Sequence, residues 1–187
     1  CFEVDTLWSG YNLGLSVNWA HVNIGAVSIE DVGDRFAWGE TSPKEEYTLA
    51  NYKYSNGTYG DMTKYNRKDS LTVLEAQDDA ATVNWGGKWR MPTSKEINEL
   101  CEKCTWEWKE INGVGGFVVS HAANSIFIPA NVEGDPHKKG CYWGKTLSYG
   151  YARATTFNIS PKGYDPQAGV GNTERWRGLP VRAVCPR

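Results

Sequence analysis

The sequence predicts an α+β protein with two helices, antiparallel sheets and long ordered loops. Residues 14–20 alternate apolar and polar side chains, the period of a strand with one buried face. Two central segments, 75–83 and 94–104, instead repeat apolar residues at helical spacing. After the glycine-rich stretch 113–116 the period of two returns. Because helices and strands occupy separate runs, the pattern favours an α+β fold over an alternating α/β fold.

The first strand, 14–20, places Val17 and Trp19 on one face. A short extended segment is expected at 33–40. Between 41 and 70 the chain is polar but carries five tyrosines. Five tyrosines are more than a disordered linker needs, so we expect a long ordered loop there.

Two helices are expected next. The first spans 75–83, with apolar residues at i, i+4 and i+7, and ends at a pair of glycines. The second begins at a capping box, because Thr93 is followed three residues later by Glu96. The apolar face of this second helix comprises Ile97, Leu100, Cys101 and Cys104.

The second half of the chain reads as a series of strands separated by Gly, Asn or Pro. The candidates are 117–120, 125–129, 140–146, 152–159 and 178–184. We expect the two ends of the chain to pair in one sheet. Residues 1–187 are expected to form a single domain, a usual size for one core.

Composition narrows the function classes. The net charge is −2 and the basic residues are scattered, so nothing indicates binding to nucleic acid. No apolar stretch approaches the length of a membrane span, and no signal peptide is recognised, which fits a leaderless or a trimmed chain. Nine tryptophans among twenty glycines indicate irregular segments held in place by buried aromatic side chains.

The five cysteines are an odd set. One disulfide is expected between the Cys101–Cys104 region and Cys185. The spacing of Cys101 and Cys104 also suggests zinc or redox chemistry, but no further zinc ligands stand at a known spacing and the pair closes a helix instead of opening one. Core cysteines are therefore the favoured interpretation. Cys1 is either a lipid-bearing cysteine that attaches the protein to a membrane or an ordinary cysteine.

Seven motifs occur in order along the chain. They are LGLSVNWA at 13–20, FAWGETSP at 36–43, DDAATVNWG at 78–86, WRMPT at 89–93, NSIFIPA at 124–130, YW at 142–143 and VRAVC at 181–185. This series resembles the Fibrobacter succinogenes major paralogous domain family of Bacteroidota surface proteins, over about residues 13 to 185. The resemblance implies a C-type-lectin-like fold, related to formylglycine-generating enzymes and to variable proteins of diversity-generating retroelements. It also implies export, often as a surface lipoprotein, and no known ligand.

The chain departs from the family pattern in three places. His21 stands where members often have cysteine, so a family disulfide cannot be copied onto this chain. Residues 142–146 and 152–157 keep the aromatic framework but change the positions between. Arg153, Ala154 and Thr156 replace tyrosines common in relatives, and adenine-directed mutation of an Asn codon encodes all three. Lys145 is not encoded in that way. Ordinary drift on a tolerant face explains the same departures.

No catalytic or metal-binding residue and no cofactor is predicted. The two triplets that supply calcium ligands in C-type lectins are absent, so binding is expected to be calcium-independent. A formylglycine-generating mechanism needs two neighbouring cysteines, and Cys141 and Cys185 are far apart in sequence. The three histidines form no arrangement with a nucleophile and a carboxylate.

The remaining candidate is a binding surface formed by 146–177. Alternation along 152–160 points Thr155, Phe157 and Ile159 to one side and Ala154, Thr156, Asn158 and Ser160 to the other. The flanking segments are rich in residue types common in adaptable recognition surfaces. The alternative is that they are simply polar loops. The predicted ligand contacts are Lys145, Tyr149, Tyr151, Arg153, Thr156, Asn158, Tyr164, Asn172 and Arg175.

The sequence therefore favours a non-enzymatic recognition domain, at the cell surface or secreted, for an unidentified protein or glycan. Two other hypotheses remain. The chain is a structural or assembly module of a surface fibre or lipoprotein, or it is a divergent relative of formylglycine-generating enzymes.

Overall fold

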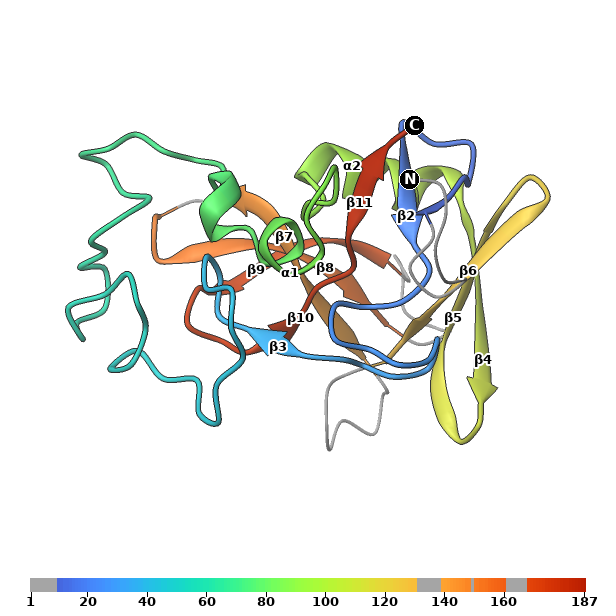
Figure 1. Cartoon of the computed structure of the whole chain (residues 1–187), viewed down its shortest axis with the longest axis horizontal. Helices are drawn as coiled ribbons and strands as arrows, with labels where there is room; N and C mark the ends of the chain where they lie inside the picture. Colours follow the sequence, from blue (N-terminus) through green and yellow to red (C-terminus); the bar gives the residue numbers. More distant parts are fainter. Residues whose placement is uncertain (1–9, 131–138, 149, 161–167) are drawn as a thin grey trace.

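The computed structural model describes residues 10–130, 139–148, 150–160 and 168–187. In these segments the protein is an α+β structure with two α-helices, and every pair of neighbouring strands is antiparallel (Figure 1). The predicted fold class is confirmed at this level. No helix within the described segments is long and apolar enough to cross a membrane.

The elements follow one another in this order: β1 (Gly10–Tyr11), β2 (Val17–Ala20), β3 (Arg35–Phe36), the 3-10 helix η1 (Ala76–Asp78), α1 (Ala80–Trp85), α2 (Ser94–Lys103), β4 (Thr105–Ile111), β5 (Val114–His121), β6 (Asn124–Pro129), β7 (Gly140–Leu147), β8 (Arg153–Ile159), β9 (Ala168–Glu174), β10 (Leu179–Pro180) and β11 (Val184–Pro186).

Within the described residues the strands form four small sheets. Their strand orders are β1-β2-β11, β10-β3, β4-β5-β6 and β7-β8-β9. The first sheet joins the two ends of the described chain, because β11 pairs with β2. The expected pairing of the chain ends is therefore confirmed.

The helices agree with the sequence in one case and differ in the other. The capping box at α2 is present: the Thr93 side chain accepts from the backbone of Glu96, whose carboxylate accepts from the backbone of Thr93. The helix expected at 75–83 is instead divided into η1 and α1 at Asp79. Asp79 has an extended backbone, and its carboxylate caps α1 by accepting from Ala81 and Thr82.

Strand β4 was not predicted. It forms a hairpin with β5 through a two-residue turn, Asn112-Gly113, in which both residues have positive φ. Asn-Gly between alternating residues is a strong hairpin signal, because a type I′ turn needs left-handed backbone at both positions. The last predicted strand, 178–184, is also divided, into β10 and β11.

The buried side chains form two clusters. One lies among the long loop 41–70, β3, α1 and β10, and contains Trp38, Tyr65 and Trp143. The other lies among α2 and the strands β2, β5, β6 and β8, and contains Trp19, Leu100 and Phe117. Trp143 is 1% exposed and its indole N–H donates to the carbonyl of Phe36, so its predicted role as a buried framework residue is confirmed.

The cysteines do not follow the expected pairing. Cys101, Cys104, Cys141 and Cys185 take part in no disulfide. Burial raises the pKa of the Cys101 thiol to about 12 and that of Cys104 to about 11, with the charge of neighbouring groups adding to the effect. Both residues belong to the apolar cluster beneath α2, as the core interpretation predicted. Cys1 lies outside the described residues.

Candidate functional site

The nine predicted contact residues do not form one surface. Tyr149 and Tyr164 lie outside the described residues. Among the other seven, three are engaged in the interior, three divide between the two faces of the β7-β8-β9 sheet, and one lies beside β8.

Lys145 holds a buried carboxylate instead of facing a ligand. Its ammonium lies 3.1 Å from an oxygen of Asp79, and only 14% of its side chain is exposed. Asp79 is fully buried and also accepts from the backbone of Met91. A buried carboxylate without a counter-charge is strongly destabilising, so Lys145 is a structural residue.

Arg175 is also an interior residue. It is fully buried, and its guanidinium lies over the rings of Trp38, Tyr52 and Tyr65. It donates to the Tyr52 hydroxyl and to three backbone carbonyls, those of Lys64, Tyr65 and Tyr151. Its side chain is therefore not available to a ligand.

Thr156 and Asn158 share a face of β8, as the alternation predicted, but differ in exposure. Thr156 is fully buried, so the expectation that it is exposed is wrong. The reason is its register opposite Trp143, on a face of the sheet that the first cluster covers. Asn158 is exposed and accepts from the Cys141 thiol. Burial raises the pKa of that thiol to about 11, so it is a poor nucleophile at neutral pH.

Arg153 and Asn172 lie on the opposite face of the same sheet. Asn172 is paired in register with Thr155, and Arg153 is paired with Glu174. Because neighbouring side chains alternate across a sheet, these residues cannot contact a ligand that also contacts Asn158 over the sheet face. Tyr151 lies beside β8, half-buried, with a positive φ.

A different group of side chains is gathered where β9 ends. Glu174 forms ion pairs with Arg153 at 3.1 Å and with Arg177 at 3.5 Å. Trp176, two residues after Glu174, is half-buried. Its ring contacts that of Tyr59 edge-to-face, with 5.7 Å between the ring centroids. We call these five residues the aromatic–arginine surface.

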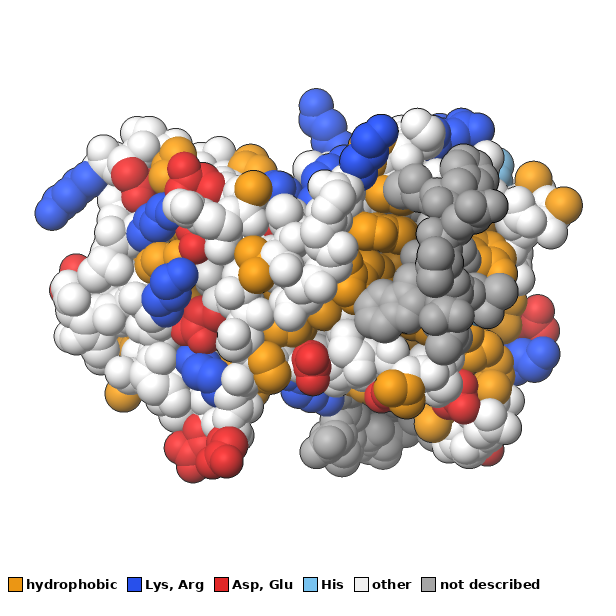
Figure 2. Space-filling model, viewed as in Figure 1, with side chains coloured by type: hydrophobic (Ala, Val, Ile, Leu, Met, Phe, Trp, Pro, Cys, Tyr) orange, Lys and Arg blue, Asp and Glu red, His pale blue; other side chains and the backbone are white. Residues whose placement is uncertain are grey.

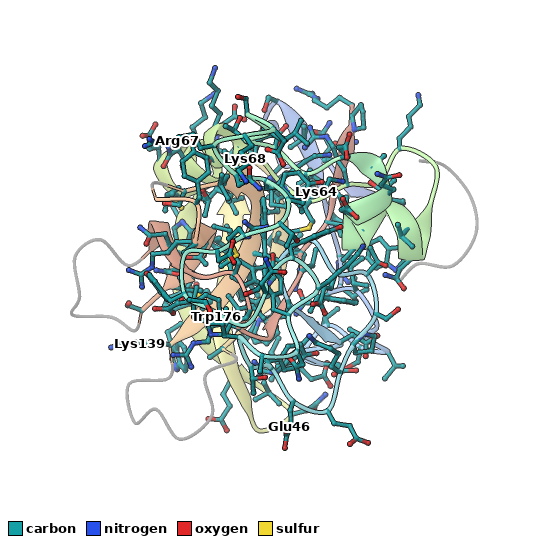
Figure 3. All side chains as sticks on the ribbon, turned by 90° about the vertical axis from the view of Figure 1, so that its left-hand side faces the viewer. Glu46, Lys64, Arg67, Lys68, Lys139 and Trp176 are labelled. Atoms are coloured by element: carbon teal, nitrogen blue, oxygen red, sulfur yellow. The ribbon has the colours of Figure 1, made fainter. Side chains whose placement is uncertain are left out.

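The aromatic–arginine surface combines exposed side chains with partly buried ones, and Trp176 also packs against the first buried cluster. Tyr59 is 64% exposed, and the side chain of Arg177 is 63% exposed. Figure 3 faces this side of the molecule and shows Trp176 between a basic group at the top, Lys64, Arg67 and Lys68, and Glu46 at the bottom. Tyr, Trp and Arg are the side chains that contribute most to recognition, because they offer large contact areas with a polar end.

The base beneath this surface is fixed by buried charge. On one side Arg175, adjacent to Trp176, ties the loop residues Tyr52, Lys64 and Tyr65 to the β8–β9 end. On the other side Asp78, 2% exposed, accepts from Tyr54, Tyr65, Lys53 and Lys64. Burial alone would raise the pKa of the Asp78 carboxyl, but these hydrogen bonds lower it to about 2. The loop that carries Tyr59 is therefore anchored on both sides.

Metal chemistry finds no support in the described residues. No three His, Cys, Asp or Glu side chains of those segments lie close enough to hold an ion together. On the face shown in Figure 2, basic and acidic side chains are interspersed and do not gather in one patch.

The chain matches no family model, no curated protein and no solved structure. No relative therefore supplies a function for the aromatic–arginine surface, and its chemistry has to be inferred from its own geometry.

The sequence identified part of this surface. Arg153 was predicted, and Trp176 and Arg177 lie at the end of the predicted segment. Glu174 lies in that segment too, but neither it nor Trp176 nor Arg177 was among the named contacts, and Tyr59 lies outside the segment. Tyr59 stands between glycines in the tip Asn56–Gly60 of a long loop, where a large aromatic residue has no strand or helix to pack against. That isolation is the signal that could have identified it.

Proposed function

We propose that this chain is a non-enzymatic recognition domain that binds its ligand at the aromatic–arginine surface. The observation that carries the proposal is the contact of exposed Tyr59 with half-buried Trp176, next in the chain to Arg177, which with Arg153 forms ion pairs to Glu174. Ring faces and edges give contact area, the guanidinium groups donate hydrogen bonds, and Glu174 accepts them. Because the base is anchored by Arg175 and Asp78, little ordering of this surface is needed on binding.

A C-type-lectin-like scaffold of the Fibrobacter succinogenes major paralogous domain family, exported to the cell surface, is part of the proposal. The sequence motifs support it, together with the α+β layout in which both chain ends share a sheet. The ligand class is a protein or a glycan, since aromatic and arginine side chains serve both.

The direct test is a combined glycan and protein array screened with the purified chain and with Trp176→Ala. The proposed site is supported by a ligand that binds the parent and binds Trp176→Ala with at least about tenfold lower affinity. Removal of an aromatic hot spot costs about 2 kcal/mol or more of binding free energy. Asn158→Ala is the matched control, because Asn158 is exposed on the other side of the sheet. Equal loss in both variants, or none in Trp176→Ala, contradicts the proposed site.

Binding is expected to be independent of calcium. The same array repeated in EDTA should give the same ligands and affinities, and the melting temperature should not change. A fall of many degrees on chelation would show that a metal stabilises the chain.

An assembly role is the second candidate. One observation favours it: β4 has a strand neighbour on one side only in the described sheet.

A further inference from the structure

The aromatic–arginine surface carries more positive than negative charge. The guanidinium groups of Arg153 and Arg177 share the single carboxylate of Glu174, at N···O distances of 3.1 Å and 3.5 Å. The two arginine side chains are 41% and 63% exposed. An arginine has five N–H donors, and each ion pair engages one nitrogen, so both side chains keep donors for an anionic ligand.

A third guanidinium lies beneath this surface. Arg175 is fully buried, and each group that accepts from it in the described segments is neutral, namely the Tyr52 hydroxyl and three backbone carbonyls. Burial lowers the pKa of Arg175, and the charge of Asp69 is among the effects that offset this in part. The Asp69 carboxylate itself accepts from three backbone N–H groups of its own loop. A buried charge without a bound counter-charge adds a positive field to the surface above it.

Positive charge continues along the same side of the molecule. Arg67 and Lys68 are exposed and form no ion pair within the segments that the structure describes. Figure 3 shows them above Trp176, with Glu46 at the opposite end. Lys64, in the same group, is already held by two carboxylates. This arrangement suits an extended ligand with repeated negative charges that runs from Trp176 toward Arg67 and Lys68.

The aromatic pair narrows the class of anion. The rings of Tyr59 and Trp176 meet at 84°, and Tyr59 is 64% exposed. An aromatic ring can receive the C–H face of a sugar ring, and a guanidinium matches the plane of a carboxylate. A uronic acid carries both features on one rigid ring. An acidic peptide carries its carboxylates on flexible side chains, whose ordering costs binding free energy, and peptides commonly dock at sheet edges or in grooves.

We propose that the ligand of the aromatic–arginine surface is an acidic polysaccharide built from uronic acid residues. The sugar rings pack against Tyr59 and Trp176, and their carboxylates bind Arg153 and Arg177. Glu174 holds both guanidinium groups in place, so these donors are ordered before the ligand arrives. This assignment rests on the proposed function, because it names the ligand class of the same surface.

Matched sugars test the charge requirement. Isothermal titration calorimetry of the whole chain uses short oligosaccharides of galacturonic, mannuronic and glucuronic acid, each beside its methyl ester, which keeps the ring and removes the charge. At least one acid should bind, and its ester should bind at least about tenfold more weakly. Raising the salt concentration from about 0.1 M to about 1 M shortens the screening distance from about 10 Å to about 3 Å, so it should weaken binding of the acid.

Substitutions at Arg177 locate the charge. Arg177→Gln should lower the affinity for the acid at least about tenfold. Arg177→Lys keeps the charge but loses the planar fork, so its affinity should lie between those of Arg177→Gln and the parent. Lys109→Gln is the control: it removes the same charge from β4, at the far end of the molecule (Figure 1), and should bind like the parent. Circular dichroism of all three should superimpose on the parent, because both positions are exposed.

The outcomes separate the ligand class from the site. The ligand class is wrong if no uronic acid oligosaccharide binds, if esters bind as tightly as acids, or if Lys109→Gln loses as much affinity as Arg177→Gln. Oligo-glutamate that binds as tightly as the sugars contradicts a glycan ligand. A neutral ligand from the array that is lost in Trp176→Ala also overturns the acidic class but leaves the proposed function standing. Acid binding that is unchanged in Trp176→Ala contradicts the site itself.

Discussion

The long loop at one end of the molecule and the β4-β5-β6 sheet at the other satisfy their backbone polar groups by different means. The sheet uses ladders of backbone hydrogen bonds over a cluster of apolar side chains. The loop, 41–70, has only an isolated bridge between Ser55 and Met62. Several of its carbonyl groups accept from backbone N–H groups in turns, and two others, those of Lys64 and Tyr65, accept from the buried guanidinium of Arg175.

Buried charge thus adds to turn hydrogen bonds where the chain has no sheet or helix. A buried carbonyl needs a donor wherever it lies, and a guanidinium offers five in a fixed plane. Arg182 does the same elsewhere, donating to the carbonyls of Ala20, His21 and Phe127. Arg175 and Lys145 are structural for this reason, which is why these two predicted contact residues proved to be interior.

The largest effect is expected from Trp143, in the buried cluster that lies against the long loop 41–70. Trp143→Ala removes a fully enclosed indole and its bond to the Phe36 carbonyl, and should reduce the free energy of unfolding by about 3–5 kcal/mol. Urea unfolding measures this. A variant that is as stable as the parent but no longer binds ligand would make Trp143 a contact residue and remove it from the framework.

The next largest effect tests whether the long loop depends on the buried guanidinium of Arg175. Arg175→Met keeps an apolar stem but leaves three carbonyls and the Tyr52 hydroxyl without their donor, so the free energy of unfolding should fall by about 3 kcal/mol. Arg177→Met is the control two residues away, exposed, with an expected change within about 0.5 kcal/mol. Similar stabilities for the two variants would show that the loop does not depend on buried charge.

Acid should affect the loop end in a defined range of pH. The pKa of Asp78 is about 2 in the folded protein, below its ordinary value near 4, so its contribution to stability is complete above about pH 4. That contribution is lost as the pH falls through 2, because the carboxyl then becomes protonated. Urea unfolding at a series of pH values should show this decline in the parent. Asp78→Asn should lack it and be less stable at neutral pH.

A smaller effect is expected at Thr93, the N-cap of α2. Thr93→Ala removes the N-cap acceptor for Glu96 and should cost about 1 kcal/mol, while Thr93→Ser should cost less. Thermal unfolding of the two variants measures the difference. Equal melting temperatures for Thr93→Ala and the parent would show that tertiary packing alone fixes the start of α2.

The smallest effects on stability are expected at the predicted contact residues that are exposed, in contrast to the one that is buried. Asn158→Ala and Asn172→Ala are exposed substitutions and should change the free energy of unfolding by no more than about 0.5 kcal/mol. Thr156 lies two residues before Asn158 on the same strand but is fully buried. Larger side chains at this position should therefore destabilise the fold. A library at these three positions, sorted for folding, separates the two classes. Free substitution at Thr156 would show that this face is open.

The sequence by itself determined what local physics controls. The capping box at Thr93, the antiparallel α+β class and the order of most strands follow from side chains a few residues apart. The Asn112-Gly113 signal would have given β4 as well. The division at Asp79 was less visible, because the N–H groups that donate to its carboxylate lie within the expected helix. Lys145 and the backbone of Met91 also bind this carboxylate, from outside that helix.

Only the tertiary structure decided which polar residues are inside. Lys145, Thr156 and Arg175 have the composition of a binding surface, yet each is enclosed by partners far away in the sequence. The pairing of Tyr59 with Trp176 is likewise a contact between two distant segments. Alternation along a strand assigns a side chain to a face, but the exposure of that face depends on what packs against it.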